Sequence, residues 1–162
     1  MSWATAGSAI FRPYLTSLIS GAEAFPMGAG QSGYKVALYN NSADPNKDVA
    51  AASGCYAVDT WVTGNECSEP TNWPAGGRPA ARAGAWVTNP GAGVIMLDIE
   101  DTASATSSTT LANVYGSLLY YDSASTPDDQ GVCFNYFGGT NSVTSGTLTI
   151  VWHANGLFRI TV

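Results

Sequence analysis

Seven short runs of apolar residues, separated by turn-forming residues, constrain the fold of this chain more than any other feature. Apolar and polar side chains alternate in several of these runs, and clusters of Gly, Pro, Asn, Asp or Ser bound each one. Such alternation is typical of β-strands, and a series of short strands between turn signals favours an antiparallel sandwich or barrel. We therefore predict an all-β fold, with one antiparallel β domain over residues 34–162. The expected strands lie within residues 34–41, 85–89, 93–99, 112–121, 131–137, 146–152 and 157–162.

The N-terminal segment has a different pattern. Phe11, Leu15 and Leu18 recur at helical spacing. Pro13 suits the first turn of a helix, and Gly21 is a natural helix stop. The sequence predicts that residues 1–33 form an N-terminal arm or short helix ahead of the β domain.

A long stretch over residues 42–83 has many turn formers and little periodicity. A connection of this length in a compact domain usually has a function or wraps a neighbour. Its aromatic residues leave three explanations open: they bind a glycan, they anchor contacts with another subunit, or they are buried in the monomer. The candidate interface residues are Phe11, Tyr14, Trp61, Trp73, Arg78 and Trp86.

The only histidine, His153, stands beside a turn signal. Two alternating runs flank Asn155-Gly156, the pair best suited to the two positive φ angles of a type I′ hairpin turn. No Ser, Cys or carboxylate close to His153 in the sequence completes a catalytic triad. We expect a tight hairpin between residues 147–152 and 158–162, and a structural role for His153.

Two carboxylates, Asp98 and Glu100, lie on the same side of a predicted strand, where they could hold a cation. The simpler interpretation is a solvated strand end that leads into the polar residues 101–110. A glycoside hydrolase would need paired carboxylates across a cleft, and neither residue has an evident partner. Because no nucleophile, base and orienting group occur together, we predict no catalytic residues, no cofactor and no enzymatic activity.

A second acidic stretch resembles the start of a calcium loop through Asp44, Asn46 and Asp48. However, Val49 stands where that loop needs glycine, and Cys55 stands where it needs glutamate. We therefore predict no metal site.

Charge and composition argue against several function classes. Six Lys and Arg against twelve Asp and Glu give a net charge of -6, so no basic surface for nucleic acid is expected. No apolar run is long enough to span a membrane, and the N-terminus lacks the charged region of a signal peptide. Cys55, Cys67 and Cys133 lack metal-ligand spacing. A disulfide between Cys55 and Cys67 and a set of three buried or half-buried thiols are both open.

Several sequence segments between about residue 30 and the end resemble, in their order along the chain, those of a known family. They are YKVALYNNSADPNKD, WVTGNE, NWPAGGR, VIMLDIEDTAS, LANVYGSLLYYD and DDQGVCFNYFGGTNSVTSGTLTIVWHANGLFRIT. In residue sequence and in order along the chain, these segments resemble a family of small virion proteins encoded by tailed phages of actinobacteria. The resemblance implies a structural component of the virion, either a capsid decoration protein or a minor tail protein, and it brings no catalytic residues.

From this resemblance we expect a capsid decoration protein, made in the host cytoplasm and located in the virion. It would bind the lattice of the major capsid protein and stabilise it, as a homo-oligomer such as a trimer at a symmetry axis. The alternative is a minor tail protein that binds host surface glycan. Neither role involves nucleic acid or a membrane.

Overall fold

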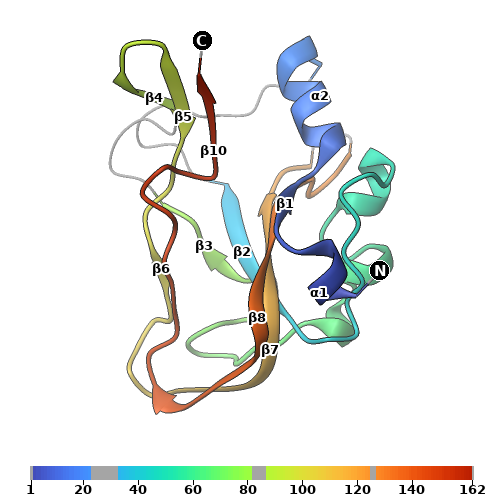
Figure 1. Cartoon of the computed structure of the whole chain (residues 1–162). Coiled ribbons are helices and arrows are strands. Elements are labelled where there is room, and N and C mark those ends of the chain that lie inside the picture. Colours follow the sequence, from blue (N-terminus) through green and yellow to red (C-terminus); the bar gives the residue numbers. More distant parts are fainter. Residues whose placement is uncertain (1, 23–32, 82–86, 125–126, 162) are drawn as a thin grey trace.

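The chain folds mainly into antiparallel strands, with short helices near its N-terminus, which confirms the predicted all-β fold class (Figure 1). The computed structural model describes residues 2–22, 33–81, 87–124 and 127–161, with the backbone alone for 87–90. Within these residues the strands form open sheets and close no barrel, an arrangement consistent with a sandwich.

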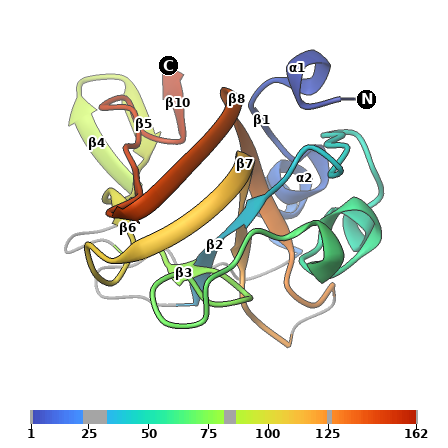
Figure 2. The same cartoon turned by 90° about the horizontal axis from the view of Figure 1, so that it is seen from below.

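The largest sheet has five strands in the order β1-β8-β7-β2-β3, and all neighbouring strands are antiparallel. Strand β2, which lies between β7 and β3, matches the strand expected within 34–41, and five of its six residues are buried. Elements cover both faces of the sheet, so this strand has few polar positions (Figure 2). The strands are β1 (Ala9–Ile10), β2 (Tyr34–Tyr39), β3 (Arg78–Pro79), β7 (Thr109–Tyr121) and β8 (Gly131–Gly146).

Two smaller sheets lie on one side of the large sheet (Figure 1). One has the order β10-β5-β4, and the other pairs β6 with β9. The β4-β5 hairpin and β10 lie at the upper end of the molecule in Figure 1, as does one end of the helix over residues 12–20. The strands are β4 (Val87–Gly91), β5 (Val94–Leu97), β6 (Thr102–Ala103), β9 (Thr149–Ile150) and β10 (Phe158–Thr161).

Short helices cover the other side of the large sheet (Figures 1 and 2). The N-terminal ones are α1 (Trp3–Ala6) and α2 (Arg12–Ser20), and the middle of the chain adds the 3-10 turns η1 (Ala51–Gly54), η2 (Asp59–Trp61) and η3 (Thr63–Asn65). Pro13 lies in the first turn of α2, and Gly21 ends it in the left-handed conformation, as predicted. No helix of the described residues has the length and apolar character needed to cross a membrane.

The N-terminal segment shares the core of the β domain. Trp3, Phe11 and Tyr14 are at most 1% exposed and belong to the same cluster of buried side chains as Leu38 and Phe134. β1 also extends the large sheet, because Ala9 and Ile10 pair with Phe134 and Cys133 of β8. Residues 3–20 are therefore an integral layer of the fold, and α2 begins at Arg12, shortly after β1 ends at Ile10.

The expected hairpin between β9 and β10 is wrong. β9 pairs with β6, and β10 pairs with β5, so the two strands belong to different sheets. The N–H of Gly156 donates to the carbonyl oxygen of His153 at 2.8 Å, which places Ala154 and Asn155 at the centre of the turn. Gly156 has a φ of 74°, whereas Asn155 is not among the residues with positive φ. A type I′ turn needs positive φ at both central residues, so the Asn-Gly pair forms a different turn here.

Candidate functional site

An open groove of about 650 Å³ lies on the surface. Its lining comes from residues 40–42, 66–68, 110–113 and 115. The segment after β2 and the start of β7 lie toward the lower end in Figure 1, away from the β4-β5 hairpin. The groove therefore lies far from the small three-stranded sheet.

Backbone pairing holds the three segments of the groove together. The N–H of Asn40 donates to the carbonyl oxygen of Asn65 at 2.9 Å, and the N–H of Cys67 donates to that of Leu38 at 2.8 Å. The start of β7 is irregular, with register shifts against β8 between Leu111 and Gly116. Asn113 lies within these shifts and has a φ of 58°, a rare conformation for a residue other than glycine. Such bulges redirect side chains at the edge of a sheet, and here they shape one wall of the groove.

Glu66 is the only charged residue among the described residues that line the groove. Its Oε2 accepts a 2.9 Å hydrogen bond from the Tyr56 hydroxyl, and its Oε1 accepts one of 2.9 Å from the N–H of Gly76. Burial raises the pKa of Glu66, and these two hydrogen bonds oppose that change by favouring the charged form. The carboxylate thus links Tyr56 with Gly76, two separate parts of the middle segment (residues 42–81), and each of its oxygens already has a donor.

Cys67 lies beside Glu66 and is a free, half-buried thiol. Its Sγ donates to the carbonyl oxygen of Asn113 at 3.7 Å. Burial, with a smaller contribution from Glu66, raises the pKa of Cys67 to about 11. The thiol is therefore protonated at neutral pH and is a poor nucleophile. Cys55 and Cys133 are also free and are buried, so the interpretation as three thiols is confirmed and the alternative disulfide is wrong.

Several polar side chains in the groove have unused hydrogen-bonding groups. Asn41, Ser68 and Asn113 are exposed, and Tyr115 is half-buried. None of these four side chains makes a hydrogen bond to another described residue. Two amides and two hydroxyls therefore face solvent in one groove and can bind a polar ligand.

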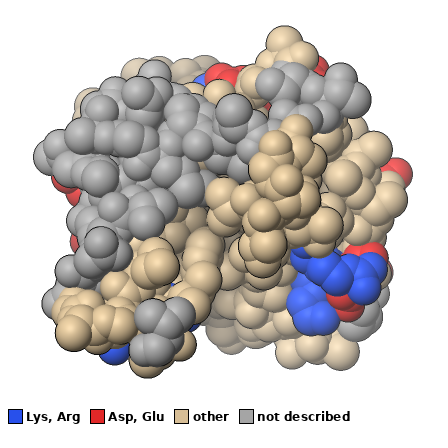
Figure 3. All heavy atoms as spheres, turned by 90° about the horizontal axis from the view of Figure 1, so that it is seen from above, with Lys and Arg blue, Asp and Glu red and all other residues tan. Residues whose placement is uncertain are grey.

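A second candidate surface is apolar and lies on the three-stranded sheet. Ile95 of β5 and Ile160 of β10 are directly paired across the strands and are 39% and 46% exposed. Figure 3 looks onto the end of the molecule that carries these strands, and most of the surface that is not grey there is uncharged. A cross-strand pair of exposed isoleucines on a charge-poor surface is typical of a contact site.

Most residues predicted at an interface are instead in the core. Phe11, Tyr14, Trp61 and Trp73 are at most 1% exposed, which leaves them no contact area for a partner. This corrects the prediction for these four residues in favour of burial in the monomer. The indole N–H of Trp73 donates to the carbonyl oxygen of Val36 at 3.2 Å, so the middle segment is fixed against β2. The aromatic rings hold this segment on the sheet, which is why they are buried.

The two remaining predicted interface residues are Arg78 and Trp86. Arg78 is half-buried, and its Nε donates to the carbonyl oxygen of Ala103 at 3.2 Å, linking β3 to β6. Trp86 lies outside the described residues. The sequence pattern did not identify Ile95 or Ile160 as contact residues, because their alternation is also that of an ordinary strand.

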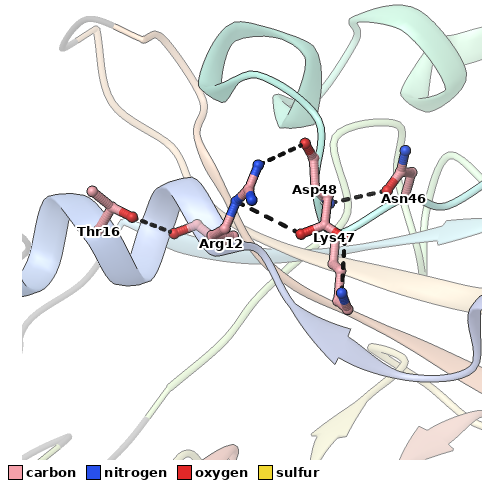
Figure 4. Close-up of polar contacts among 5 residues, drawn as sticks. All are labelled: Arg12, Thr16, Asn46, Lys47 and Asp48. Atoms are coloured by element: carbon pink, nitrogen blue, oxygen red, sulfur yellow. Dashed lines mark hydrogen bonds and ion pairs between the residues drawn. The ribbon is translucent and has the colours of Figure 1, made fainter.

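The stretch compared with a calcium loop has its own charge partners (Figure 4). Asp48 contacts Lys47 Nζ at 2.8 Å and Arg12 Nε at 3.6 Å, and its N–H donates to Asn46 Oδ1 at 3.0 Å. The Lys47 hydrogen bond is the main cause that lowers the pKa of Asp48. Arg12 also donates from Nη2 to the carbonyl oxygen of Asp48 at 3.3 Å, and its own carbonyl accepts from Thr16 Oγ1. These contacts connect α2 with the loop around Asp48.

The carboxylates of the other acidic stretch lie at different depths. Asp98 is half-buried, Glu100 is exposed, and Ile99 between them is 4% exposed. The described residues contain no group of three or more His, Cys, Asp or Glu side chains that could hold a metal ion. His153 is exposed, and its Nδ1 accepts a 3.0 Å hydrogen bond from the N–H of Asn155.

Comparison with known proteins adds no relative. No protein-family model matches the chain, and neither a curated protein nor a solved structure is significantly similar to it. Membership of the phage virion family is therefore a proposal, and the polar groove and the isoleucine pair are the structural basis for inferring a function.

Proposed function

We propose that this chain is a structural protein of a tailed-phage virion that decorates the capsid. The observation that carries the proposal is the exposed Ile95–Ile160 pair, formed by neighbouring residues of β5 and β10. The sequence resemblance to small virion proteins is the reason for proposing the lattice of the major capsid protein as the partner.

The isoleucine pair suits an interface because the rest of the chain holds it rigidly. β5 is paired on both sides, with β10 and with β4. On the same face of the sheet the pair is followed by Leu97 and Phe158, which are directly opposite one another, and Leu97 is 2% exposed. The exposed isoleucines thus continue a row that starts in the core. Covering them with a partner removes apolar area from water, which contributes about 25 cal/mol per Å².

Binding of this kind would stabilise a capsid by mass action. A protein that binds only the assembled lattice adds its binding free energy to the assembled state, and many copies add many such increments. The decorated particle should then resist loss of its DNA better than the bare one, while assembly itself does not need the protein.

A homo-oligomer, such as a trimer around a symmetry axis, is part of the proposal. β10 stands at the edge of its sheet among the described strands. An edge strand offers unpaired N–H and C=O groups to another chain. Identical copies that meet through such an edge form a closed ring when the rotation between them closes.

A minor tail protein that binds host surface glycan is the second candidate. The polar groove favours it, because the free side chains of Asn41 and Asn113 are suited to hydroxyl-rich ligands. The two candidates differ in where the protein sits in the particle.

The apolar pair provides the test. The double variant Ile95→Ser/Ile160→Ser should bind purified capsids that lack the protein about 10-fold more weakly or worse in a co-sedimentation titration, because contact anchors contribute about 2 kcal/mol or more. The matched control is Val151→Ser, since Val151 is 74% exposed but lies outside this sheet. Urea unfolding of each variant checks that the fold persists. Equal binding by the double variant and the parent would overturn the proposed contact.

A further inference from the structure

We infer that the groove formed by residues 40–42, 66–68, 110–113 and 115 is a binding site for a short neutral oligosaccharide. The inference names the ligand class of a site that the capsid contact does not use. It holds for a decoration protein and for a tail protein alike.

The size of the groove fits a ligand of a few sugar rings. Its volume is about 650 Å³, within the usual range of about 300 to 1,000 Å³ for small-molecule sites. The groove is open to solvent rather than enclosed, so a short oligosaccharide can enter it directly.

The free groups of the groove match the hydroxyls of a sugar. The Asn41 and Asn113 amides each offer two donors and one acceptor oxygen, and the hydroxyls of Ser68 and Tyr115 can donate and accept. Sugar hydroxyls also donate and accept, so each can pair with such groups. The Tyr115 ring lines the same groove and offers an apolar face with a polar end, as the C–H face of a sugar ring requires.

The charge of the groove selects against ionic ligands. No Lys or Arg occurs among the described residues that line it, so a phosphate, sulfate or carboxylate group would find no counter-charge. The single carboxylate, Glu66, has a donor on each oxygen, from Tyr56 and from Gly76. It also repels anions. A neutral ligand is therefore the class that the groove accepts.

The backbone of Asn113 is a second, independent feature of the site. A left-handed backbone conformation at a non-glycine residue raises the energy of the fold, so the surrounding structure must stabilise it. Such residues are concentrated at ligand sites, and Asn113 is one of them. The N–H of Asn113 donates to Ser142 Oγ at 3.3 Å, and its carbonyl accepts from Cys67. Both backbone groups are thus used, while the side-chain amide stays free for a ligand.

The groove should bind the glycan without cleaving it. Glycoside hydrolysis usually needs two carboxyl groups about 5 to 10 Å apart on either side of the bond. Among the described lining residues Glu66 is the only one with a carboxyl group, and it is already hydrogen-bonded. An added oligosaccharide should therefore be recovered intact.

The test uses the full-length protein and a panel of defined probes. Tri- and tetrasaccharides of glucose, mannose, galactose and arabinose are screened by saturation-transfer NMR, and those that bind are titrated by calorimetry. Sialyllactose is the charged comparison. We expect at least one neutral probe to bind with a Kd of about 1 mM or tighter. Sialyllactose should bind more weakly, and no probe should be hydrolysed.

Groove variants assign the binding to this site. Asn113→Gly removes the amide but suits the left-handed backbone, and Asn41→Ala and Tyr115→Ala each remove another side chain that lines the groove. Each should weaken the neutral probe at least about fivefold, whereas Thr144→Ala, an exposed position on β8 outside the groove, should not. Absence of binding by every neutral probe would overturn the inference, as would binding that all three variants leave unchanged. Capsid binding of the same variants should equal that of the parent, which separates this inference from the proposed capsid role.

Discussion

The hydroxyl of Tyr39 donates a 2.7 Å hydrogen bond to the carbonyl oxygen of Trp61, and the two rings meet edge to face with centroids 5.0 Å apart. Tyr39 ends β2, and Trp61 ends the turn η2, so this contact fixes the middle segment to the sheet. Trp61 also meets the rings of Trp3 and Phe11 at 5.8 and 6.1 Å. One indole therefore joins the sheet, the N-terminal segment and the middle segment.

Trp61→Ala should destabilise the protein by about 3 to 5 kcal/mol, because it removes a large buried ring from this junction. Tyr39→Phe should cost about 1 kcal/mol, since it removes one hydrogen bond and keeps the ring. Urea unfolding followed by tryptophan fluorescence measures both. Val62→Ala, at the exposed neighbouring position, is the control and should change stability by less than about 0.5 kcal/mol. A Trp61→Ala protein as stable as the control would contradict this role.

Gly116→Ala should destabilise the fold by about 2 kcal/mol or more, because the added methyl has no space. A Cβ there would lie 2.5 Å from the ring of Trp3 and would clash with the carbonyl oxygen of Asn135. Gly64→Ala is the matched control, since a Cβ at Gly64 meets nothing within 4 Å. Thermal unfolding of the two variants compares them, and equal melting temperatures would show that Trp3 does not pack against β7 in this way.

The positions of most strands along the chain were predictable from the sequence, whereas the pairing of the strands was not. Alternation identifies β2, β5, β7 and β8, because each buries one or both faces against a neighbour. The partner of β9 depends on contacts between residues far apart in the sequence, such as the hydrogen bond from the N–H of Trp152 to Asp101 Oδ1 at 2.9 Å, which joins residues 51 positions apart. Local turn chemistry contains no information about such a contact, so Asn155-Gly156 suggested the wrong pairing.

The stability of the Glu66→Gln variant relative to the parent protein should increase as the pH rises. Burial raises the pKa of Glu66 above 4.5, so the folded protein holds this proton at a higher pH than the unfolded chain. Stability of the parent therefore falls as the pH rises from the unfolded pKa through the folded one, and the loss is complete above it. Glutamine has no such loss.

Urea unfolding of the parent and Glu66→Gln on either side of this pH window measures the difference. Tyr56→Phe gives an internal check, because it removes a hydrogen bond that lowers the pKa of Glu66 and should make the pH dependence steeper. A stability difference between parent and Glu66→Gln that is the same at every pH would contradict the raised pKa.

Gly156→Ala should destabilise the protein far more than His153→Ala. Gly156 has a φ of 74°, and a Cβ there would clash with the carbonyl oxygen of Leu97. His153 is exposed and only accepts a hydrogen bond from the N–H of Asn155, so its loss should change stability by less than about 0.5 kcal/mol. Denaturant midpoints of the two variants test this order, and the reverse order would contradict a structural role of the turn.

The candidate sites were harder to predict than the fold. Aromatic residues in a turn-rich stretch have the same sequence pattern whether they face a partner or the core, and only the contacts of Trp61 and Trp73 decide between these positions. The groove joins Asn41 and Asn113, which are far apart in the sequence and carry no motif. Its one local signal, an asparagine within an apolar run at β7, also fits an ordinary solvent-facing position.

The number and position of copies in purified virions test the capsid proposal most directly. Quantitative mass spectrometry relative to the major capsid protein, with cryo-electron microscopy of the same particles, gives both values. We predict many copies in fixed proportion to the major capsid protein, on the outer capsid surface, with the Ile95–Ile160 sheet facing the lattice. A few copies confined to the tail would contradict capsid decoration and favour the tail role.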